Sequence, residues 1–165
     1  MADTSEIELL DMYDKNGNKT GIIRKRSEPM EDEEYHRIVH VWIKNSDNKF
    51  LITKRSPEKN FCPDMWECPG GFVVSGEESA AAALREVKEE TGITLTPDKG
   101  ELISSFTEGD YLKDIWLFNE YIDIKNAVLQ ESETCGIKFA SKDDIVKMIG
   151  NREFVLYVKY IYDLL

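Results

Sequence analysis

The stretch from Gly71 to Ile93 constrains the fold of this chain more than any other, and it reads GFVVSGEESAAAALREVKEETGI. Ser75 is a preferred helix N-cap residue, and Glu78 stands at the spacing of a capping box. The alanine-rich run that follows forms helices readily. Gly92 then supplies the left-handed residue that ends many helices. The stretch therefore predicts a loop that runs directly into a helix.

One side of this predicted helix is apolar and the neighbouring side is acidic. At about 100° per residue, one narrow stripe predicts the buried face: Ala80, Ala83, Leu84, Val87 and Thr91. Glu86, Glu89 and Glu90 form an acidic arc beside it, and such like charges destabilise an isolated helix by about 0.2–0.5 kcal/mol per pair. A solvated acidic face is one interpretation. The other is a Mg²⁺ or Mn²⁺ site, because hard divalent cations take oxygen ligands.

The same stretch matches a longer pattern, G-x5-E-x7-R-E-U-x-E-E-x-G-U, in which U is apolar. Its fixed positions are Gly71, Glu77, Arg85, Glu86, Val87, Glu89, Glu90, Gly92 and Ile93. This pattern is the Nudix box, so the chain resembles the MutT-like Nudix hydrolases. The resemblance implies an α/β/α sandwich with a mixed β-sheet. It also implies a metal-dependent enzyme that cleaves a diphosphate linkage by directing water at phosphorus.

Motif positions carry the family's roles over to this chain. Glu86 and Glu90 are the implied principal metal ligands, and Glu89 is implied to bind a further ion or to act as a base. Arg85 is implied to hold these carboxylates by ion pairing. Glu77 is implied to support the loop from behind the ligands.

The resemblance leaves the general base open and adds one backbone ligand. The carbonyl of Gly70, just before the first glycine of the box, is implied to join the metal shell. Some family members take the base from the box and others take it from a later loop. Here Glu131 and Glu133 are the first candidates, followed by Glu120 and Glu108.

Two basic residues are candidates for binding the substrate. Lys54 and Arg55 end a predicted strand and could neutralise phosphate, although an ordinary solvated strand end is an equal interpretation. The box selects the reaction, and other loops select the leaving group. A nucleoside di- or triphosphate, or a related nucleoside diphosphate derivative, is the first expectation.

The N-terminal half is also similar to a particular subgroup, the isopentenyl-diphosphate isomerase-like Nudix proteins, through ELLDMYDKNGNKTG, YHRIVHVWIKN and KRSPEKNFCPDMWECPGG. Those isomerases use a histidine-rich metal site and a cysteine shortly after a tryptophan. Here Cys68 stands too soon after Trp66, and the box is intact, which favours a hydrolase over an isomerase. His36 and His40 alternate with apolar residues and are expected to be structural. A non-catalytic sensor of nucleotide derivatives is a further alternative, but all the box carboxylates are retained.

The order of elements predicts an α/β fold. The expected strands are 6–13 and 22–26, which form a hairpin within an N-terminal extension (1–30), then 36–44, 49–54, 101–107, 114–122 and 136–140. Residues 56–69 are expected to form a loop with Trp66 in the core. Ser141 and Asp144 predict a capped helix to Ile149. Asn151 is expected to cap a last helix whose apolar side packs into the core or against a second copy in a homodimer: Phe154, Tyr157, Val158, Ile161, Leu164 and Leu165.

Length and charge narrow the function further. The 165 residues suit one domain spanning 1–165. The net charge of −11 argues against nucleic-acid binding, but a divalent cation lets an acidic pocket accept a small diphosphate. No apolar run approaches a membrane span, and the N-terminus lacks the features of a signal peptide. A cytoplasmic protein with free thiols and no membrane partner is therefore expected.

Overall fold

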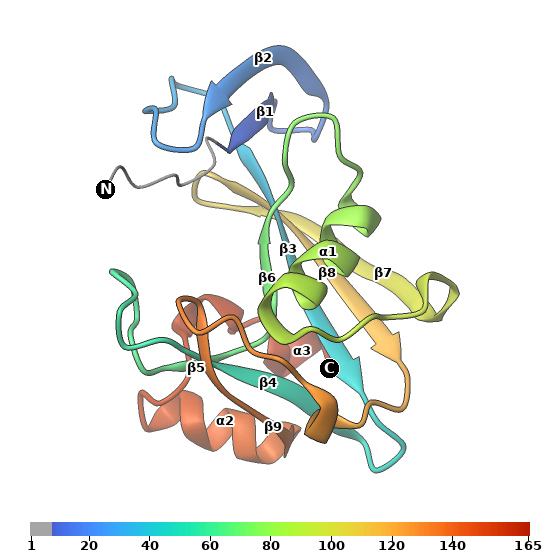
Figure 1. Ribbon diagram of the computed structural model, residues 1–165. Coiled ribbons are helices and arrows are strands. Elements are labelled where there is room, and N and C mark those ends of the chain that lie inside the picture. Colours follow the sequence, from blue (N-terminus) through green and yellow to red (C-terminus); the bar gives the residue numbers. More distant parts are fainter. Residues whose placement is uncertain (1–7) are drawn as a thin grey trace.

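A mixed β-sheet with helices on both faces forms the centre of the computed structural model, which describes residues 8–165 (Figure 1). Its strands are β3 (His36–Lys44), β4 (Lys49–Arg55), β5 (Trp66–Glu67), β6 (Gly70–Phe72), β7 (Gly100–Glu108), β8 (Tyr111–Asn119) and β9 (Thr134–Ser141). The main path runs β5-β4-β3-β8-β7, with β6 paired to β3 and β9 paired to β4. Only β3 and β8 run parallel among these pairs of the described chain. The predicted α/β class with a mixed sheet is confirmed.

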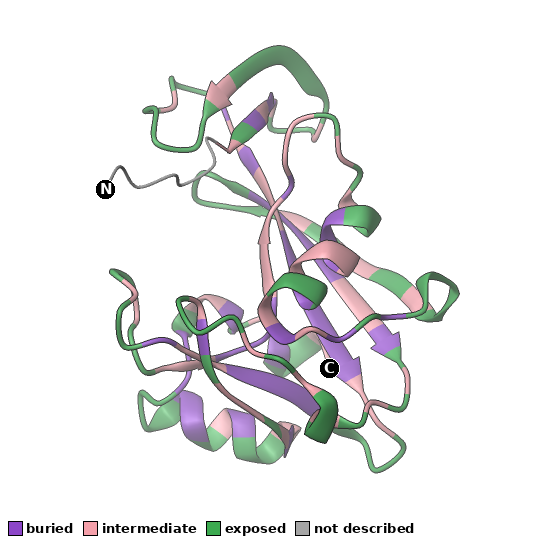
Figure 2. Ribbon diagram, viewed as in Figure 1, coloured by how far each residue is buried: buried purple, intermediate pink, exposed green. Residues whose placement is uncertain are grey.

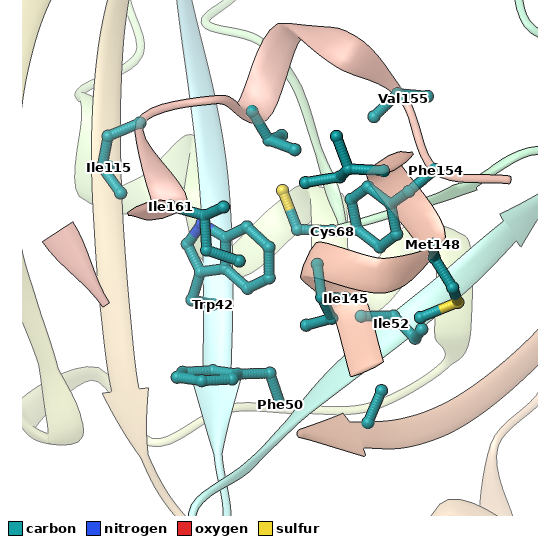
Figure 3. Close-up of a cluster of buried hydrophobic side chains, with 13 residues drawn as sticks. Trp42, Phe50, Ile52, Cys68, Ile115, Ile145, Met148, Phe154, Val155 and Ile161 are labelled. Carbon is teal, nitrogen blue, oxygen red and sulfur yellow. The ribbon is translucent and has the colours of Figure 1, made fainter. Parts of the chain in front are cut away.

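The central strand β3 is buried on both faces because its apolar residues alternate between two cores (Figure 2). Val39, Val41 and Ile43 pack with α1 (Ser79–Thr91), which covers one face. Trp42 packs on the other face, against α2 (Lys142–Gly150) and α3 (Ile161–Leu164) (Figure 3). A strand buried on both faces favours β-branched and aromatic residues, as HRIVHVWIK has.

The strands β3 and β4 separate soon after the turn that joins them. Their register contains only the pair Lys44 and Phe50 within the described chain. Beyond this pair, β6 forms hydrogen bonds with β3 and β5 forms hydrogen bonds with β4, each along the edge that the other strand of the turn leaves unpaired. The split opens the sheet where the segment between β5 and β6 meets α1.

An N-terminal hairpin forms a separate small sheet from β1 (Leu9–Tyr13) and β2 (Lys19–Lys25). The predicted hairpin is present, although its second strand begins earlier than the expected 22–26. Residues 6 and 7 of the expected first strand lie outside the described residues. Asp11 anchors the hairpin to the loop before α1, since its carboxylate accepts from Ser75 Oγ at 3.0 Å and from Gly76 N at 3.0 Å.

The N-cap prediction for α1 is wrong. The hydroxyl of Ser75 is used by Asp11, so it does not cap the helix. The helix begins at Ser79, and Glu78 at the N-cap makes no capping side-chain bond. Gly92 ends the helix with φ of 71°, as expected.

The buried side of α1 is wider than the predicted stripe. Ala83, Val87 and Thr91 are buried, but Ala80 is exposed and Ala82 is buried instead. Ala82 lies one turn before Glu86 on the helix, on the carboxylate side. Its burial means that protein covers this side of α1, which argues against a solvated acidic face.

The C-terminal third holds one accurate prediction and several corrections. Ser141 and Asp144 form the expected capping box at the start of α2. The β7–β8 turn is shorter than expected, and β8 runs from Tyr111 to Asn119 instead of 114–122. Two short 3₁₀ turns, Pro97–Lys99 and Ile124–Asn126, flank this hairpin.

The long last helix predicted from Asn151 is absent from the described chain. Asn151 is the C-cap of α2, and only a 3₁₀ turn (Leu156–Val158) and the short α3 follow. The reason is that the chain first runs extended beside Trp66, whose backbone bonds Glu153 O at 2.8 Å and Val155 N at 3.0 Å. Trp66 is half-buried rather than in the core, and the Lys138 ammonium lies 4.2 Å from the centre of its ring.

Candidate active site

A cavity of about 660 Å³ lies where β3 and β4 separate, a size that is typical of small-molecule sites. The β5–β6 segment and β3 form its floor, and α1 contributes three carboxylates to one wall. The tip of the β7–β8 hairpin, the loop after β4 and the loop before β9 complete the walls. Segments from the whole chain therefore converge on the residues of the box.

Two carboxylates of α1 are enclosed beside this cavity. The side chain of Glu86 is 14% exposed, and burial raises its pKa to about 7 although Arg85 lowers it. Burial also raises the pKa of Glu90 well above its usual value, and the nearby Glu67 and Glu86 raise it further. Glu90 Oε2 is enclosed without a hydrogen-bond partner among residues 8–165. Glu86 is thus only partly compensated by Arg85, and Glu90 is buried beside two other carboxylates.

Arg85 ties the box together through all of its donor positions. It donates to both oxygens of Glu77, at 2.8 and 2.9 Å, and to the carbonyl of Phe72 at 2.9 Å. Its third nitrogen donates to Glu86 Oε1 at 2.8 Å and to Glu89 Oε2 at 3.1 Å. Glu77 also accepts from the backbone of Val74 at 3.2 Å, so the loop and the helix are joined through one guanidinium. Glu89 is 52% exposed and lies at the rim.

Two glycines let the backbone of β6 approach the carboxylates. A Cβ at Gly71 would lie 2.4 Å from the carboxylate carbon of Glu86. A Cβ at Gly70 would lie 2.2 Å from the carbonyl oxygen of Val39. Real side chains cannot come this close, so any larger residue at either position would displace the strand or the carboxylate.

Basic side chains line other parts of the cavity, and each is paired with a carboxylate that lines it too. The pairs are Arg26 with Glu8, Arg55 with Glu67, Lys59 with Glu133, and Lys113 with Glu108. Arg55 also donates to Phe61 O at 2.9 Å, and Lys113 donates to Tyr157 O at 3.1 Å. The cavity thus combines enclosed carboxylates with cations suited to anionic groups.

The model of the NUDIX domain family matches residues 34–158 of this chain. The chain belongs to the Nudix family. An uncharacterized Nudix hydrolase of Listeria monocytogenes is 30% identical over 154 residues, which cover 92% of this chain and 90% of that protein. Nudix hydrolase 3 of Arabidopsis thaliana is 30% identical over 167 residues, which cover 93% of this chain and 22% of that protein. An isopentenyl-diphosphate Delta-isomerase of Citrobacter koseri is 30% identical over 86 residues, or 52% of this chain and 48% of that protein.

Solved structures show the same fold. The crystal structure of DR0079 from Deinococcus radiodurans superposes with a TM-score of 0.78 at 20% identity, covering 95% of this chain and 99% of that one. The MutT Nudix hydrolase of Burkholderia pseudomallei superposes with a TM-score of 0.65 at 18% identity, covering 81% and 99%. This Nudix chain is a hydrolase that acts on pyrophosphate bonds. No helix within residues 8–165 has the length and apolarity needed to cross a membrane.

Nudix hydrolases generally use divalent metal ions, and the carboxylates of this site fit one. Within the described chain, no three acidic, histidine or cysteine side chains enclose an ion by themselves. Mg²⁺ does not require such a cage, because it keeps several waters and often binds one or two carboxylates together with substrate oxygens. The enclosed, unpartnered oxygen of Glu90 and the raised pKa of Glu86 fit such a cation.

Several residues predicted from the sequence lie away from this Nudix site. Lys54 pairs with Asp64 at 3.4 Å and lies outside the cavity, whereas its neighbour Arg55 lines it. Glu131 is exposed and does not line the cavity. Glu120 instead accepts from Thr96 Oγ1 at 2.5 Å on another part of the surface. Lys54 and Arg55 differ in their position relative to the cavity because adjacent residues of β4 point to opposite faces of the sheet.

Glu67, His40 and Tyr157 are among the cavity residues that the sequence analysis did not identify as part of the site. Glu67 lies on β5 and accepts from the hydroxyl of Tyr157 at 2.5 Å. Burial raises the pKa of both groups. His40 lies on β3, and burial together with Lys113 lowers its pKa to about 3, so it is neutral. The sequence pattern groups Tyr157 with an apolar stripe, and Glu67 has no motif of its own except its place three residues before Gly70.

Proposed function

We propose that this Nudix hydrolase uses Mg²⁺ or Mn²⁺ to cleave the diphosphate linkage of a nucleoside di- or triphosphate, or of a related nucleoside diphosphate derivative. The observation that carries the proposal is the pair of enclosed carboxylates, Glu86 and Glu90, at one cavity wall. A bound divalent ion neutralises charge on phosphate and lowers the pKa of a coordinated water. A cytoplasmic location and a homodimer stay predictions.

The residues of the box have distinct parts in this proposal. Glu86 and Glu90 hold the metal together with the carbonyl of Gly70. Arg85 keeps Glu86 in one orientation and offsets the repulsion within the acidic cluster, since it bonds Glu77, Glu86 and Glu89. Ligand orientation by such supporting contacts is worth about 10–100-fold in metal affinity or activity.

Arg55, Lys59 and Lys113 are proposed to neutralise the phosphates that do not contact the metal. Each must exchange its carboxylate partner for a phosphate oxygen, so the cation stays paired while its carboxylate is freed. Glu133 is released from Lys59 by the exchange. Glu133 and Glu89 are proposed as the candidates for accepting the proton of the attacking water; that both line the cavity supports this proposal.

A substrate panel tests the proposal. Nucleoside di- and triphosphates, nucleotide sugars and dinucleoside diphosphates are incubated with Mg²⁺ or Mn²⁺ in water enriched in ¹⁸O. We expect metal-dependent turnover that EDTA abolishes, and one ¹⁸O atom in a phosphate product identified by mass. Tight binding of one compound without turnover of any would contradict hydrolysis and indicate a sensor.

A further inference from the structure

Behind the cavity floor lies a buried polar cluster that the proposed reaction does not use. The hydroxyl of Tyr160 is 2.6 Å from Nδ1 of His40 and 3.0 Å from Nε1 of Trp42. It also contacts the thiol of Cys68, which burial keeps protonated by raising its pKa. Trp42 and Cys68 lie together in the core beneath α2 (Figure 3). Four polar groups thus meet in an otherwise apolar layer.

The donors and acceptors of this cluster define one arrangement of protons. The indole of Trp42 can only donate, so the oxygen of Tyr160 accepts from it. The thiol of Cys68 is a weak donor with the same oxygen in reach. The single hydroxyl proton of Tyr160 therefore goes to the strongest acceptor present, Nδ1 of His40. With Nδ1 as the acceptor, the ring proton of His40 lies on the other ring nitrogen, Nε2.

That second nitrogen is in contact with the cavity. His40 is 5% exposed and lines the cavity wall. No described residue forms a hydrogen bond with His40 Nε2. This atom is also not among the fully enclosed polar atoms that lack a partner within residues 8–165, so it is accessible from the cavity. The ring is held between Tyr157 and Tyr160, with centroids 5.5 and 5.6 Å away.

The location is next to the proposed metal site. His40 is the direct β-sheet partner of Gly70. Its side chain lies on the face of β3 that carries Trp42, opposite the face that packs against α1, and it shares one cavity with the carboxylates of α1. Lys113 lines the same cavity. A donor here faces the part of the cavity beyond the proposed metal site, where a phosphate group that does not contact the metal can lie.

We propose that His40 is a substrate-binding residue that donates from Nε2 to a phosphate oxygen of the bound diphosphate, and that Tyr160 is the positioning residue that fixes its tautomer. This inference rests on the proposed function. The donor is oriented before the substrate arrives, so little reorganisation accompanies binding or the build-up of charge on the phosphate. Unlike the cations of the cavity, it has no carboxylate to exchange.

The tautomer can be read in the free protein by NMR, because the chain has only two histidines, His36 and His40. Long-range ¹⁵N–¹H spectra of histidine-labelled protein, assigned with a His36→Gln variant, should show His40 protonated at Nε2. The Tyr160→Phe variant should lose this single tautomer while the Cys68→Ser variant keeps it. Protonation of His40 at Nδ1 in the wild type would overturn the proposal without any substrate.

Binding is tested with methylenediphosphonate, a diphosphate analogue that cannot be hydrolysed, in the presence of Mg²⁺. The Nε2–H resonance of His40 should move on saturation and stay in place when the Glu86→Gln variant is titrated. An unmoved resonance in wild-type protein saturated with the analogue would overturn the proposal.

Two substitutions separate the donor from a structural role. The amide nitrogen of Gln reaches the Nε2 position, whereas that of Asn reaches only the Nδ1 position. With ADP, CDP, GDP and UDP as substrates, His40→Gln should retain most of kcat/KM and His40→Asn should lose roughly ten- to a hundredfold. Melting curves check that both variants fold.

The outcomes distinguish the two proposals. Equal losses in the folded Gln and Asn variants, in an enzyme that turns over its substrate, would reject the role of His40 and leave the hydrolase intact. A wild-type protein that turns over nothing in the panel would reject the proposed function, and the tautomer and the analogue titration would still decide the role of His40.

Discussion

At the scale of single residues, the site contains buried carboxylates whose ionised form is unfavourable unless a positive charge lies beside it. Glu90 is enclosed near Glu67 and Glu86, and its pKa is raised by burial and by both neighbours. A carboxylate in such surroundings is unfavourable to ionise unless a cation joins it. Ionised Glu90 is therefore unfavourable in the free protein, and a metal ion bound beside it should favour the ionised form.

Glu90→Gln should keep the fold and lose most of the activity. Glutamine has nearly the shape of the protonated acid, so the melting temperature should stay or rise. Loss of a charged ligand removes several kcal/mol from the transition state, which corresponds to at least about a hundredfold in kcat. The matched control is Glu131→Gln, an exposed residue outside the cavity, which should behave as wild type. Unchanged turnover in Glu90→Gln would reject its assignment as a ligand.

Cys68→Ser should leave hydrolysis close to wild type. Burial keeps this thiol protonated, so it is no thiolate nucleophile, and a serine hydroxyl can still donate to Tyr160. Steady-state kinetics on the best substrate of the panel measure the effect. A collapse of kcat in a variant that melts normally would point to thiol chemistry instead.

At the scale of elements, the site depends on how closely β6 and the N-terminal hairpin approach the box. β6 contributes only three residues, two of which are glycines, and it lies against β3 on one side and Glu86 on the other. The hairpin is tied to the box loop through the carboxylate of Asp11 and a backbone bond from Ser75 N to Leu9 O at 2.7 Å. Small changes at these two junctions should move the carboxylates of the box.

Gly71→Ala should reduce activity more than stability. The new methyl group would overlap the carboxylate of Glu86, and overpacking of this kind costs about 1–3 kcal/mol. The displaced Glu86 should weaken Mg²⁺ binding, which calorimetry measures directly. Gly76→Ala in the same loop is the control for metal binding: no atom lies within 4 Å of its Cβ position, although its φ of 79° adds backbone strain. Wild-type metal affinity in Gly71→Ala would show that the close approach is unimportant.

The junction at Asp11 should weaken in acid. Although burial raises the pKa of Asp11, bonds from Gly76, Lys19 and Ser75 lower it below 3.8 in balance. A lowered carboxylate pKa contributes stability that is present above the unfolded value and is lost as the pH falls through the folded one. Amide exchange in β1 and β2 should therefore accelerate below pH 3.8 in wild type. The Asp11→Asn variant should lack this step, and identical profiles would exclude Asp11 as its source.

At the scale of the whole molecule, the cavity joins segments from most of the chain, so metal binding and folding are coupled. A ligand that binds only the folded state stabilises it by about 2.7 kcal/mol at a concentration of 100 Kd. For a chain of this size, Mg²⁺ at that concentration should raise Tm by about 5–10 °C. The double variant Glu86→Gln/Glu90→Gln should show no such rise. An equal rise in that variant would place the metal elsewhere.

Much of the fold and the core of the site could be predicted because their signals are local. The box pattern identified the family, the helix, its end at Gly92 and the carboxylates on one side. β-Branched and aromatic residues identified β3, the turn at 46–48 identified β4 as its partner, and the Ser141–Asp144 box identified α2. In each case residues within a few positions of one another determine the outcome, through backbone propensity, capping or side-chain periodicity.

The remaining features depend on contacts between distant segments. By sequence alone, Ser75 is an ordinary N-cap candidate, but in the folded chain its hydroxyl donates to Asp11 of the hairpin instead. Residues 153–155 belong to a helical pattern in the sequence, but in the structure they are extended because they form hydrogen bonds with the backbone of Trp66. Glu133 lines the cavity whereas Glu131, two residues earlier, is exposed outside it.

The sequence by itself determined the reaction class, since one helical turn and its preceding loop hold the box residues at their required spacing. Only the tertiary structure decided which carboxylates are enclosed, which cations face them and that His40 meets both Tyr160 and the cavity. The physical reason is that burial and desolvation arise from the whole packed chain. Neither the pKa of a carboxylate nor the tautomer of a histidine is a property of its neighbours in sequence alone.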